Sequence, residues 1–313
     1  MKEVTKMFKC PVEGCNEMFT RNNNRRRHIR HFHGEDPDKY LFRSGAFKHV
    51  PKAPVGARKI LLISDLHHPH HNIKAWRAVL QFMEWFEPDE VNLMGDGMNM
   101  DSSDHWLRDK GNLRAREGKR IIEGYSWFDQ DILTKIEQVA PQAHWVYMGG
   151  NHEDWINAVI DKDPALEGLI EPEIVLNLAA RGWEWIPYIM VKGDETSKGR
   201  KRYGKLTVMH GTKTTKYHSE KVANDSSTSV AYGHTHDIQR YSKVFEDDPK
   251  SFHTAEAIGC LCNLHPAFMK GNWHRWVNAF GVLYVREDGT YNLYTPVIIK
   301  GRFTYAGIEF NGN

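Results

Sequence analysis

The sequence lacks an uninterrupted apolar run of about 18 residues, the length that a helix needs to cross a bilayer. Its first 30 residues are polar and basic, without the apolar core of a secretion signal. Cysteine is scarce, with four in 313 residues, in the close pairs Cys10/Cys15 and Cys260/Cys262. This count does not fit a secreted disulfide framework and favours a reducing compartment where thiolates bind metal. We therefore expect a cytoplasmic protein with no membrane partner.

A large charge of one sign is also missing, because the formal net charge is only +2. Total charge therefore does not indicate a nucleic-acid-binding protein. The basic residues are unevenly placed, since residues 1–35 hold eight Lys or Arg against four Glu. Hydrophobic residues make up 40% and charged residues 26%, which is typical of a globular chain.

The length fits one large domain with a small appendage. We assign a small module to residues 1–34, a linker with several Pro and Gly residues to 35–56, and the large domain to 57–313. From residue 58, short apolar runs typical of buried strands alternate with helical spacing, which predicts a layered α/β domain. The chain closes with a predicted hairpin that turns at Asp288–Gly289.

The small module contains four metal-ligand residues at the spacing of a two-Cys/two-His zinc finger, C-x₂₋₄-C-x₁₂-H-x₃₋₅-H. The resemblance implies a ββα fold closed by one structural zinc, with the ligands Cys10, Cys15, His28 and His33. One position departs from the pattern, because Arg25 stands where a leucine is usual. Zinc would then supply nearly all the folding energy. A disordered basic arm with chance spacing is the alternative.

If the finger helix starts near Asn22, helix positions −1, 3 and 6 are occupied by Arg21, Asn24 and Arg27. Arginine pairs with guanine and asparagine with adenine, which predicts a preference for a 5′-GAG-3′-like triplet. A single finger buries little surface, so its binding should be weak and sensitive to salt. The alternative is a module that serves protein interaction or stability.

Polar side chains follow five predicted strands of the large domain. A single one is more often a helix cap or a satisfied core residue, but five in order indicate one site, at the strand ends where α/β sheets bind ligands. They are Asp65 and His67, then Asp96, then Asn151, His152 and Glu153, then His210, and finally His234 and His236.

This ordered set resembles the motif series of the calcineurin-like metallophosphoesterase family, D-x-H, G-D-x-x-D, G-N-H-[DE], H and G-H-x-H. The resemblance spans residues 59–299 and implies a four-layer α/β sandwich, two mixed β-sheets flanked by helices. The segments SDLHHPHHN, GCLCNLHP and NWHRWVNAF are similar to a branch of the family frequent in bacteriophages. One departure is Asn99, where the second motif has its second Asp, a residue that is not a direct ligand in the family.

The resemblance implies two divalent transition metals, Mn, Fe or Zn, as expected for mixed oxygen and imidazole ligands. The first metal would be held by Asp65, His67 and His236, the second by Asn151, His210 and His234, with Asp96 bridging both. The bridging residue must be Asp or Glu, since only an anion with two oxygens can hold both ions. The metals would neutralise a phosphate ester and lower the pKa of a water between them.

His152 would act as general acid on the leaving group, and Glu153 would orient His152 from behind. Further histidines crowd the first motif. We expect His71 to line the pocket, and His68 and His70 to lie on the surface. The pair Cys260/Cys262, with His265 nearby, is expected in the core, although a third metal site stays open.

The favoured function is a metal-dependent phosphodiesterase or nuclease tethered to nucleic acid by the finger, since tethering raises the local substrate concentration. One alternative is a phosphomonoesterase, a small-nucleotide phosphodiesterase or a protein phosphatase whose finger serves assembly. A second is a non-catalytic DNA-binding factor. If the chain is phage-encoded, its place is the host cytoplasm. The sequence leaves the oligomeric state open.

Overall fold

The computed structural model describes residues 8–10, 12, 14–19, 22–34, 54, 56–101, 118–245, 248–266 and 271–313. The chain divides into two compact units, residues 1–50 and 51–313, and the division falls within the stretch 35–56. Most of that stretch lies outside the described residues, so the bounds of the linker remain a prediction. No helix in the described ranges is both long and apolar enough to span a bilayer.

The first unit has the order strand, strand, helix. Strand β1 (Phe8–Lys9) pairs antiparallel with β2 (Met18–Phe19), and α1 runs over Asn22–Phe32. Its small core holds Cys10 and Ile29, with Val12, Cys15 and Phe19 packed against them. Arg25 occupies the position where a leucine is usual and provides no aliphatic core side chain. The buried aliphatic side chain of α1 is instead that of Ile29.

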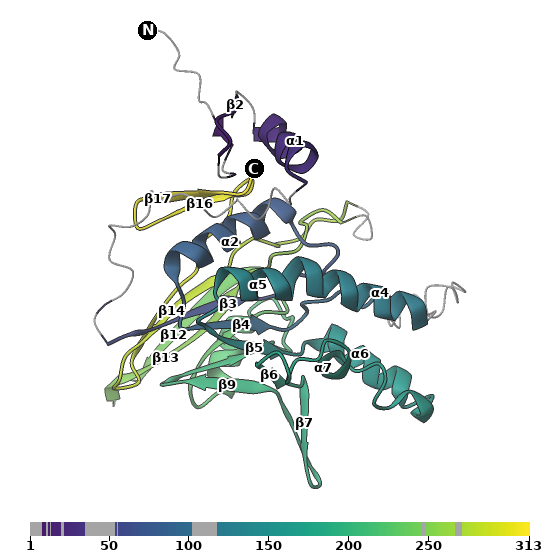
Figure 1. Cartoon of the computed structure of the whole chain (residues 1–313). Helices are drawn as coiled ribbons and strands as arrows, with labels where there is room; N and C mark the ends of the chain where they lie inside the picture. The colour runs from purple at the N-terminus through teal and green to yellow at the C-terminus, as the bar shows by residue number, and fades with distance from the viewer. Residues whose placement is uncertain are drawn as a thin grey trace. The chain divides into compact units, whose positions relative to one another are not determined.

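The second unit contains a six-stranded sheet (Figure 1). Its order is β15-β14-β3-β4-β5-β6, in which β3 to β6 are parallel and β14 is antiparallel to both neighbours. The strands are β3 (Arg58–Ile63), β4 (Glu90–Met94), β5 (His144–Met148), β6 (Trp183–Ile186), β14 (Gly281–Val285) and β15 (Tyr291–Tyr294). The turn between β14 and β15 contains Asp288 and Gly289, as predicted.

A second sheet has five strands in the order β12-β13-β11-β10-β9. Its strands β10, β11 and β13 are parallel, while β9 and β12 pair antiparallel at the two edges. They are β9 (Arg200–Tyr203), β10 (Leu206–Met209), β11 (Ser229–Tyr232), β12 (Ile238–Phe245) and β13 (Asp248–Ile258). Two separate hairpins complete the described strands, β7 (Ile189–Lys192) with β8 (Glu195–Lys198), and β16 (Arg302–Tyr305) with β17 (Ile308–Asn311).

The main core lies between the two sheets. Alternate residues of β3 and β5, such as Ile60 and Val146, pack against Leu206 and Val208 of β10 in one buried cluster. Side chains on one face of a strand repeat every two residues, so each sheet presents an apolar face to the other. The unit is therefore a mixed α/β structure with several sheets, as the sequence predicted.

Helices lie on the outer faces. The described helices are α2 (Ile73–Phe86), α4 (Gly118–Phe128), a π-helical turn (Asp129–Leu133), α5 (Thr134–Val139), α6 (Asn151–Ile160), a 3₁₀ turn (Pro164–Leu166), α7 (Pro172–Val175) and α8 (His218–Asp225). Helix α2 begins where Asn72 accepts a hydrogen bond from the Ala75 amide, and it buries Phe82 and Phe86. Helix α8 covers the second sheet, with Ala223 packed among Val230 and Ala255.

This topology determines where the polar motifs meet. Strands β3, β4 and β5 are parallel neighbours in one sheet, and β10 and β11 are parallel neighbours in the other. Their carboxyl ends are followed by the motifs that begin at Asp65, Gly95, Gly150, His210 and Gly233. Polar side chains from both sheets can therefore reach one place beyond the strand ends.

Candidate metal centre

The backbone around the predicted ligands is unusually strained. Half of the ten non-glycine residues with positive φ in the described ranges are predicted metal ligands, namely Asp65, His67, Asp96, His234 and His236. Each such residue costs about 1–3 kcal/mol and persists only where its surroundings enforce it. The protein therefore tolerates a loss of folding stability in order to orient these five side chains. Such strain indicates a functional site.

Glycines next to the motifs allow a very close approach between them. A Cβ atom on Gly150 would overlap the carboxylate of Asp96, and one on Gly233 would overlap Ser64 and Asp65. Any side chain at either position would displace a predicted ligand. The glycines that begin these two motifs are therefore needed for close packing and not only for turn geometry.

The first ligand group joins both sheets. Nε2 of His67 lies 3.0 Å from Nε2 of His236, and Oδ1 of Asp65 lies 3.1 Å from the same His236 nitrogen. Two ligands at about 2.0–2.2 Å from one ion are about 3.0–3.5 Å apart, so this spacing fits a metal. Oδ1 of Asp65 is buried, and no donor among the described residues is aligned to hydrogen-bond with it. A cation would satisfy that oxygen.

The second group lies on the other side of Asp96. Nε2 of His210 is 3.1 Å from Oδ1 of Asn151 and 3.4 Å from Oδ2 of Asp96. Ligand atoms of Asp96, His210 and His234 all lie within 4.8 Å of one another. The buried His/Asp clusters of this unit can therefore hold metal ions.

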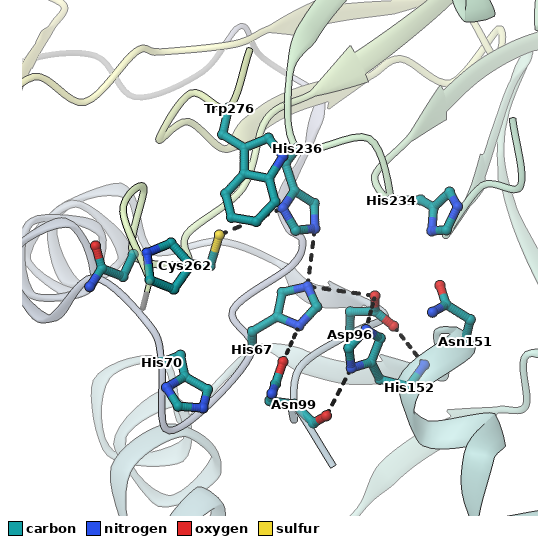
Figure 2. A pocket seen from close by; sticks show the side chains of 12 residues that line it. His67, His70, Asp96, Asn99, Asn151, His152, His234, His236, Cys262 and Trp276 are labelled. Atoms are coloured by element: carbon teal, nitrogen blue, oxygen red, sulfur yellow. Dashed lines mark hydrogen bonds and ion pairs between the residues drawn. The ribbon is translucent and has the colours of Figure 1, made fainter. Parts of the chain in front are cut away.

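Asp96 faces both groups with one oxygen. Its Oδ2 lies 3.6 Å from Nε2 of His67, a contact that Figure 2 shows. The same oxygen lies 3.4 Å from Nε2 of His210. Its Oδ1 accepts a hydrogen bond of 3.0 Å from the backbone N–H of His152. The first turn of α6 thus orients Asp96 through Oδ1, and Oδ2 faces both ligand groups.

The hydrogen bonds that His67 and His210 make through Nδ1, the nitrogen directed away from the ligand groups, determine which tautomer each ring adopts. Nδ1 of His67 donates to Oδ1 of Asn99 at 2.9 Å, and Nδ1 of His210 donates to the carbonyl of Met94 at 3.0 Å. Each bond leaves the Nε2 lone pair directed at the ligand group. Asn99, which departs from the family motif, thus serves as the acceptor behind His67.

Behind His236 the structure places a thiol. Sγ of Cys262 lies 3.7 Å from Nδ1 of His236 and 3.4 Å from Sγ of Cys260. Both cysteines are buried, as the sequence predicted for the core. The contact between Cys262 and His236 could not be predicted from the sequence, because the two residues are far apart in the chain. The sequence showed only that His265 lies close to Cys260 and Cys262.

Buried charges of opposite sign hold the centre together. Burial alone would raise the pKa values of Asp65 and Asp96, but the facing histidines outweigh it and lower both. Burial alone would likewise lower the pKa of His210, but Asp96 raises it to about 9. A divalent cation would compete with protons for these same ligand atoms.

His152 is held at the edge of the centre. Its Nδ1 donates to the backbone carbonyl of Asn99 at 2.8 Å, its Nε2 lies 3.8 Å from Oδ2 of Asp96, and its ring packs on Trp155. Burial lowers the pKa of His152 to about 4, although Asp96 opposes the shift. The neutral ring therefore presents an Nε2 lone pair, and it must gain a proton before it can act as an acid.

Glu153 does not orient His152, which corrects the sequence-based role. Its carboxylate accepts hydrogen bonds from the backbone N–H groups of Asp96, Met98 and Gly150 and from the hydroxyl of Tyr147. Glu153 stands at the third position of α6, where a side chain bends back to the helix start, away from the neighbouring His152. Its burial raises its pKa.

A cavity of about 170 Å³ opens onto the centre. His70 lines it and His71 does not, so the prediction for His71 is wrong. The ring of His71 instead stacks on His68, with centroids 5.1 Å apart. His68 is buried against Asp131 and is not a surface residue. Burial lowers the pKa of His71 to about 4.

The first unit brings its four predicted zinc ligands together. Sγ of Cys10 lies 3.6 Å from Nε2 of His33, Sγ of Cys15 lies 3.4 Å from Nε2 of His28, and the two histidine nitrogens are 3.1 Å apart. These separations suit a tetrahedral ion with bonds of about 2.0–2.3 Å. The unit therefore carries a Cys/His cluster that can hold a metal.

Two of the three predicted base-contacting residues are among the described residues. Asn24 and Arg27 are exposed on α1, three residues apart on one side of the helix. Arg21 lies outside the described residues. Their contact with nucleic acid stays a prediction.

Comparison with known proteins finds that the chain is similar to proteins of two bacteriophages. No family model matches it. It is 24% identical over 259 residues to the Gene 54 protein of Mycobacterium phage L5 and 26% identical to that of phage D29, in both cases over 80% of this chain and 98% of the phage protein. Among solved structures it is similar to Vps29 of Cryptosporidium parvum, with 14% identity, a TM-score of 0.37, and 82% of this chain and 98% of that chain covered.

Proposed function

We propose that the large unit is a two-metal phosphoesterase of the calcineurin-like type. The observation that carries this proposal is the position of Asp96, whose Oδ2 lies between the ligand nitrogens of His67 and His210. One carboxylate oxygen shared by two buried ligand groups suits a pair of divalent ions. Two such ions neutralise the phosphate and acidify the attacking water.

The described lining of the cavity favours an anionic substrate when metal is bound. No Lys or Arg is among the described residues that line it, and the ligand Asp96 is its only carboxylate. Among these described residues a phosphate ester would meet histidines but no lysine or arginine. The two ligand groups are therefore the means by which this chain can compensate the substrate's charge.

The chain's own groups then have distinct tasks. Asn99 fixes the tautomer of His67, and the amide of His152 fixes the orientation of Asp96. Nε2 of His152 is the group positioned to take up a proton near the reacting phosphate and to pass it to the leaving oxygen. Glu153 holds the loop after β4 against α6, so that these groups keep their separations.

We propose nucleic acid as the substrate and the first unit as a zinc finger that tethers it. The cluster of Cys10, Cys15, His28 and His33 supports zinc, and exposed Asn24 and Arg27 support contact with bases. In a phage-infected cell the reaction would take place in the host cytoplasm. A phosphomonoesterase or a protein phosphatase is the competing function, with the finger used for assembly.

An activity panel tests the proposal. The full chain, loaded with Mn²⁺, is incubated with bis-p-nitrophenyl phosphate, p-nitrophenyl phosphate and plasmid DNA. Hydrolysis of the diester and of DNA is expected. Activity on the monoester alone would favour the competing enzymes, and inactivity on all three with two metals bound would favour a non-catalytic DNA-binding factor.

A further inference from the structure

One wall of the metal cavity is built from residues outside the two ligand groups. It consists of His70, Cys262, Asn263, Pro266 and Trp276. The largest of these is Trp276, whose ring packs against His236 with centroids 4.4 Å apart at 57° (Figure 2). An indole therefore lies directly beside the place where the phosphate would bind.

The described residues of this wall favour an uncharged group as the ligand. None of the five residues is a carboxylate, a lysine or an arginine. Asn263 is exposed, and its Oδ1 accepts a hydrogen bond of 3.0 Å from the amide of His265. That bond orients the side-chain amide, whose N–H groups can serve a carbonyl of a ligand. An aromatic surface beside an amide suits a flat, uncharged ring with polar edges.

The aromatic surface continues beyond the cavity. The ring of His274 lies 4.8 Å from that of Trp276, and the ring of His265 lies 5.5 Å from that of His274. The backbone N–H of Trp276 donates to Nδ1 of His274 at 3.2 Å, which holds the His274 ring beside the backbone of Trp276. Neighbouring aromatic rings beside a phosphate site are the kind of group on which unpaired bases stack.

We propose that Trp276 is a stacking platform for a nucleobase of the substrate, so that the enzyme selects unpaired nucleoside phosphodiesters. This inference rests on the proposed phosphoesterase function and adds the substrate class. Stacking requires an unpaired base, because a duplex hides the faces of its bases. The substrate is therefore an unpaired stretch within a longer DNA such as a plasmid, a single strand, a frayed end or a small nucleotide diester.

Two substrates that share a leaving group and differ only in the base measure what the base contributes to binding. They are thymidine 5′-p-nitrophenyl phosphate and its abasic counterpart, the same ester of 1,2-dideoxyribose. A base stacked on an aromatic ring strengthens binding about 5- to 150-fold. We expect the thymidine ester to have the lower KM by a factor in that range, and Trp276→Ala to bring the ratio of the two KM values close to one. Trp276→Phe should restore much of the ratio.

Trp273→Ala is the matched control, because Trp273 is exposed in the same segment and does not line the cavity. It should leave the ratio of KM values as in the wild type. Equal KM values for both esters in the wild type would overturn the inference, as would a Trp276→Ala variant that keeps the wild-type ratio.

A binding measurement separates this inference from the phosphoesterase proposal. Calorimetry on the Mn²⁺-loaded chain compares thymidine 5′-monophosphate with inorganic phosphate. Tighter binding of the nucleotide, lost in Trp276→Ala, supports the platform even if neither ester is hydrolysed, in which case the proposed activity alone is wrong. Equal affinity for both ligands in the wild type would exclude the platform even if the esters are hydrolysed.

Discussion

Asn99 and His67 form a hydrogen bond in which Nδ1 of the imidazole donates to the side-chain oxygen at 2.9 Å. The backbone carbonyl of the same Asn99 accepts from His152 at 2.8 Å. One residue thus fixes the rings of a predicted ligand and of the predicted proton-transfer group. The usual second Asp of the motif is absent, yet its position still supplies an acceptor.

The first prediction concerns this acceptor. Asn99→Ala should weaken metal binding by about 10- to 100-fold, because His67 loses the bond that holds its Nε2 toward the metal. Asn99→Asp restores an acceptor and should retain most of the affinity. Titration with Mn²⁺ measures both. Unchanged affinity in Asn99→Ala would show that His67 is oriented by other means.

A second prediction tests the shared position of Asp96. Asp96→Asn keeps the shape but removes the anion, so the chain should bind at least one metal fewer in the large unit and lose turnover. Asp161→Asn, a change at an exposed carboxylate, is the control and should behave as wild type. Elemental analysis beside steady-state rates provides the measurement. A full metal complement in Asp96→Asn would contradict the bridging role.

His152 should matter for rate and not for metal. Replacing it with Ala removes Nε2 near the reacting phosphate and should lower kcat by about 10²- to 10⁴-fold. The metal content should stay that of the wild type. If the variant lost its metals, the proton-transfer assignment would fail, since the rate would then report a missing ion.

Glu153 should behave as a structural residue. Glu153→Gln places a donor among the backbone N–H groups of Asp96, Met98 and Gly150, which leaves at least one buried donor unpaired. We expect the free energy of unfolding to fall by about 1–3 kcal/mol in urea denaturation. Glu167→Gln, at an exposed position, should change it little. Equal stability of the two variants would argue against the structural role.

The finger can be tested apart from catalysis. Cys15→Ser removes one thiolate of the Cys/His cluster, so the first unit should lose its zinc and its fold. Hydrolysis of bis-p-nitrophenyl phosphate should be unaffected, because no residue of the first unit belongs to the predicted metal centre. Cleavage of DNA at low protein concentration should fall. If DNA cleavage stayed at the wild-type rate, the tethering role would be excluded.

Several expectations depended on patterns within short stretches, and these agree with the structure. The apolar runs before Asp65, Asp96 and Asn151 form β3, β4 and β5, and the hairpin turns at Asp288–Gly289. Local composition suffices here, because strand periodicity and turn chemistry act over a few residues. The expectations for His71 and Glu153 failed because each depended on which way a side chain points.

The sequence by itself determined which chemical groups follow each strand, in what order, and which glycines stand beside them. It also determined the spacing of the four finger ligands. Only the tertiary structure decided that Oδ2 of Asp96 faces both ligand groups, that Asn99 stands behind His67, and that Trp276 lies beside His236. These contacts join residues far apart in the chain, and their geometry follows from the packing of two sheets, which no local pattern encodes.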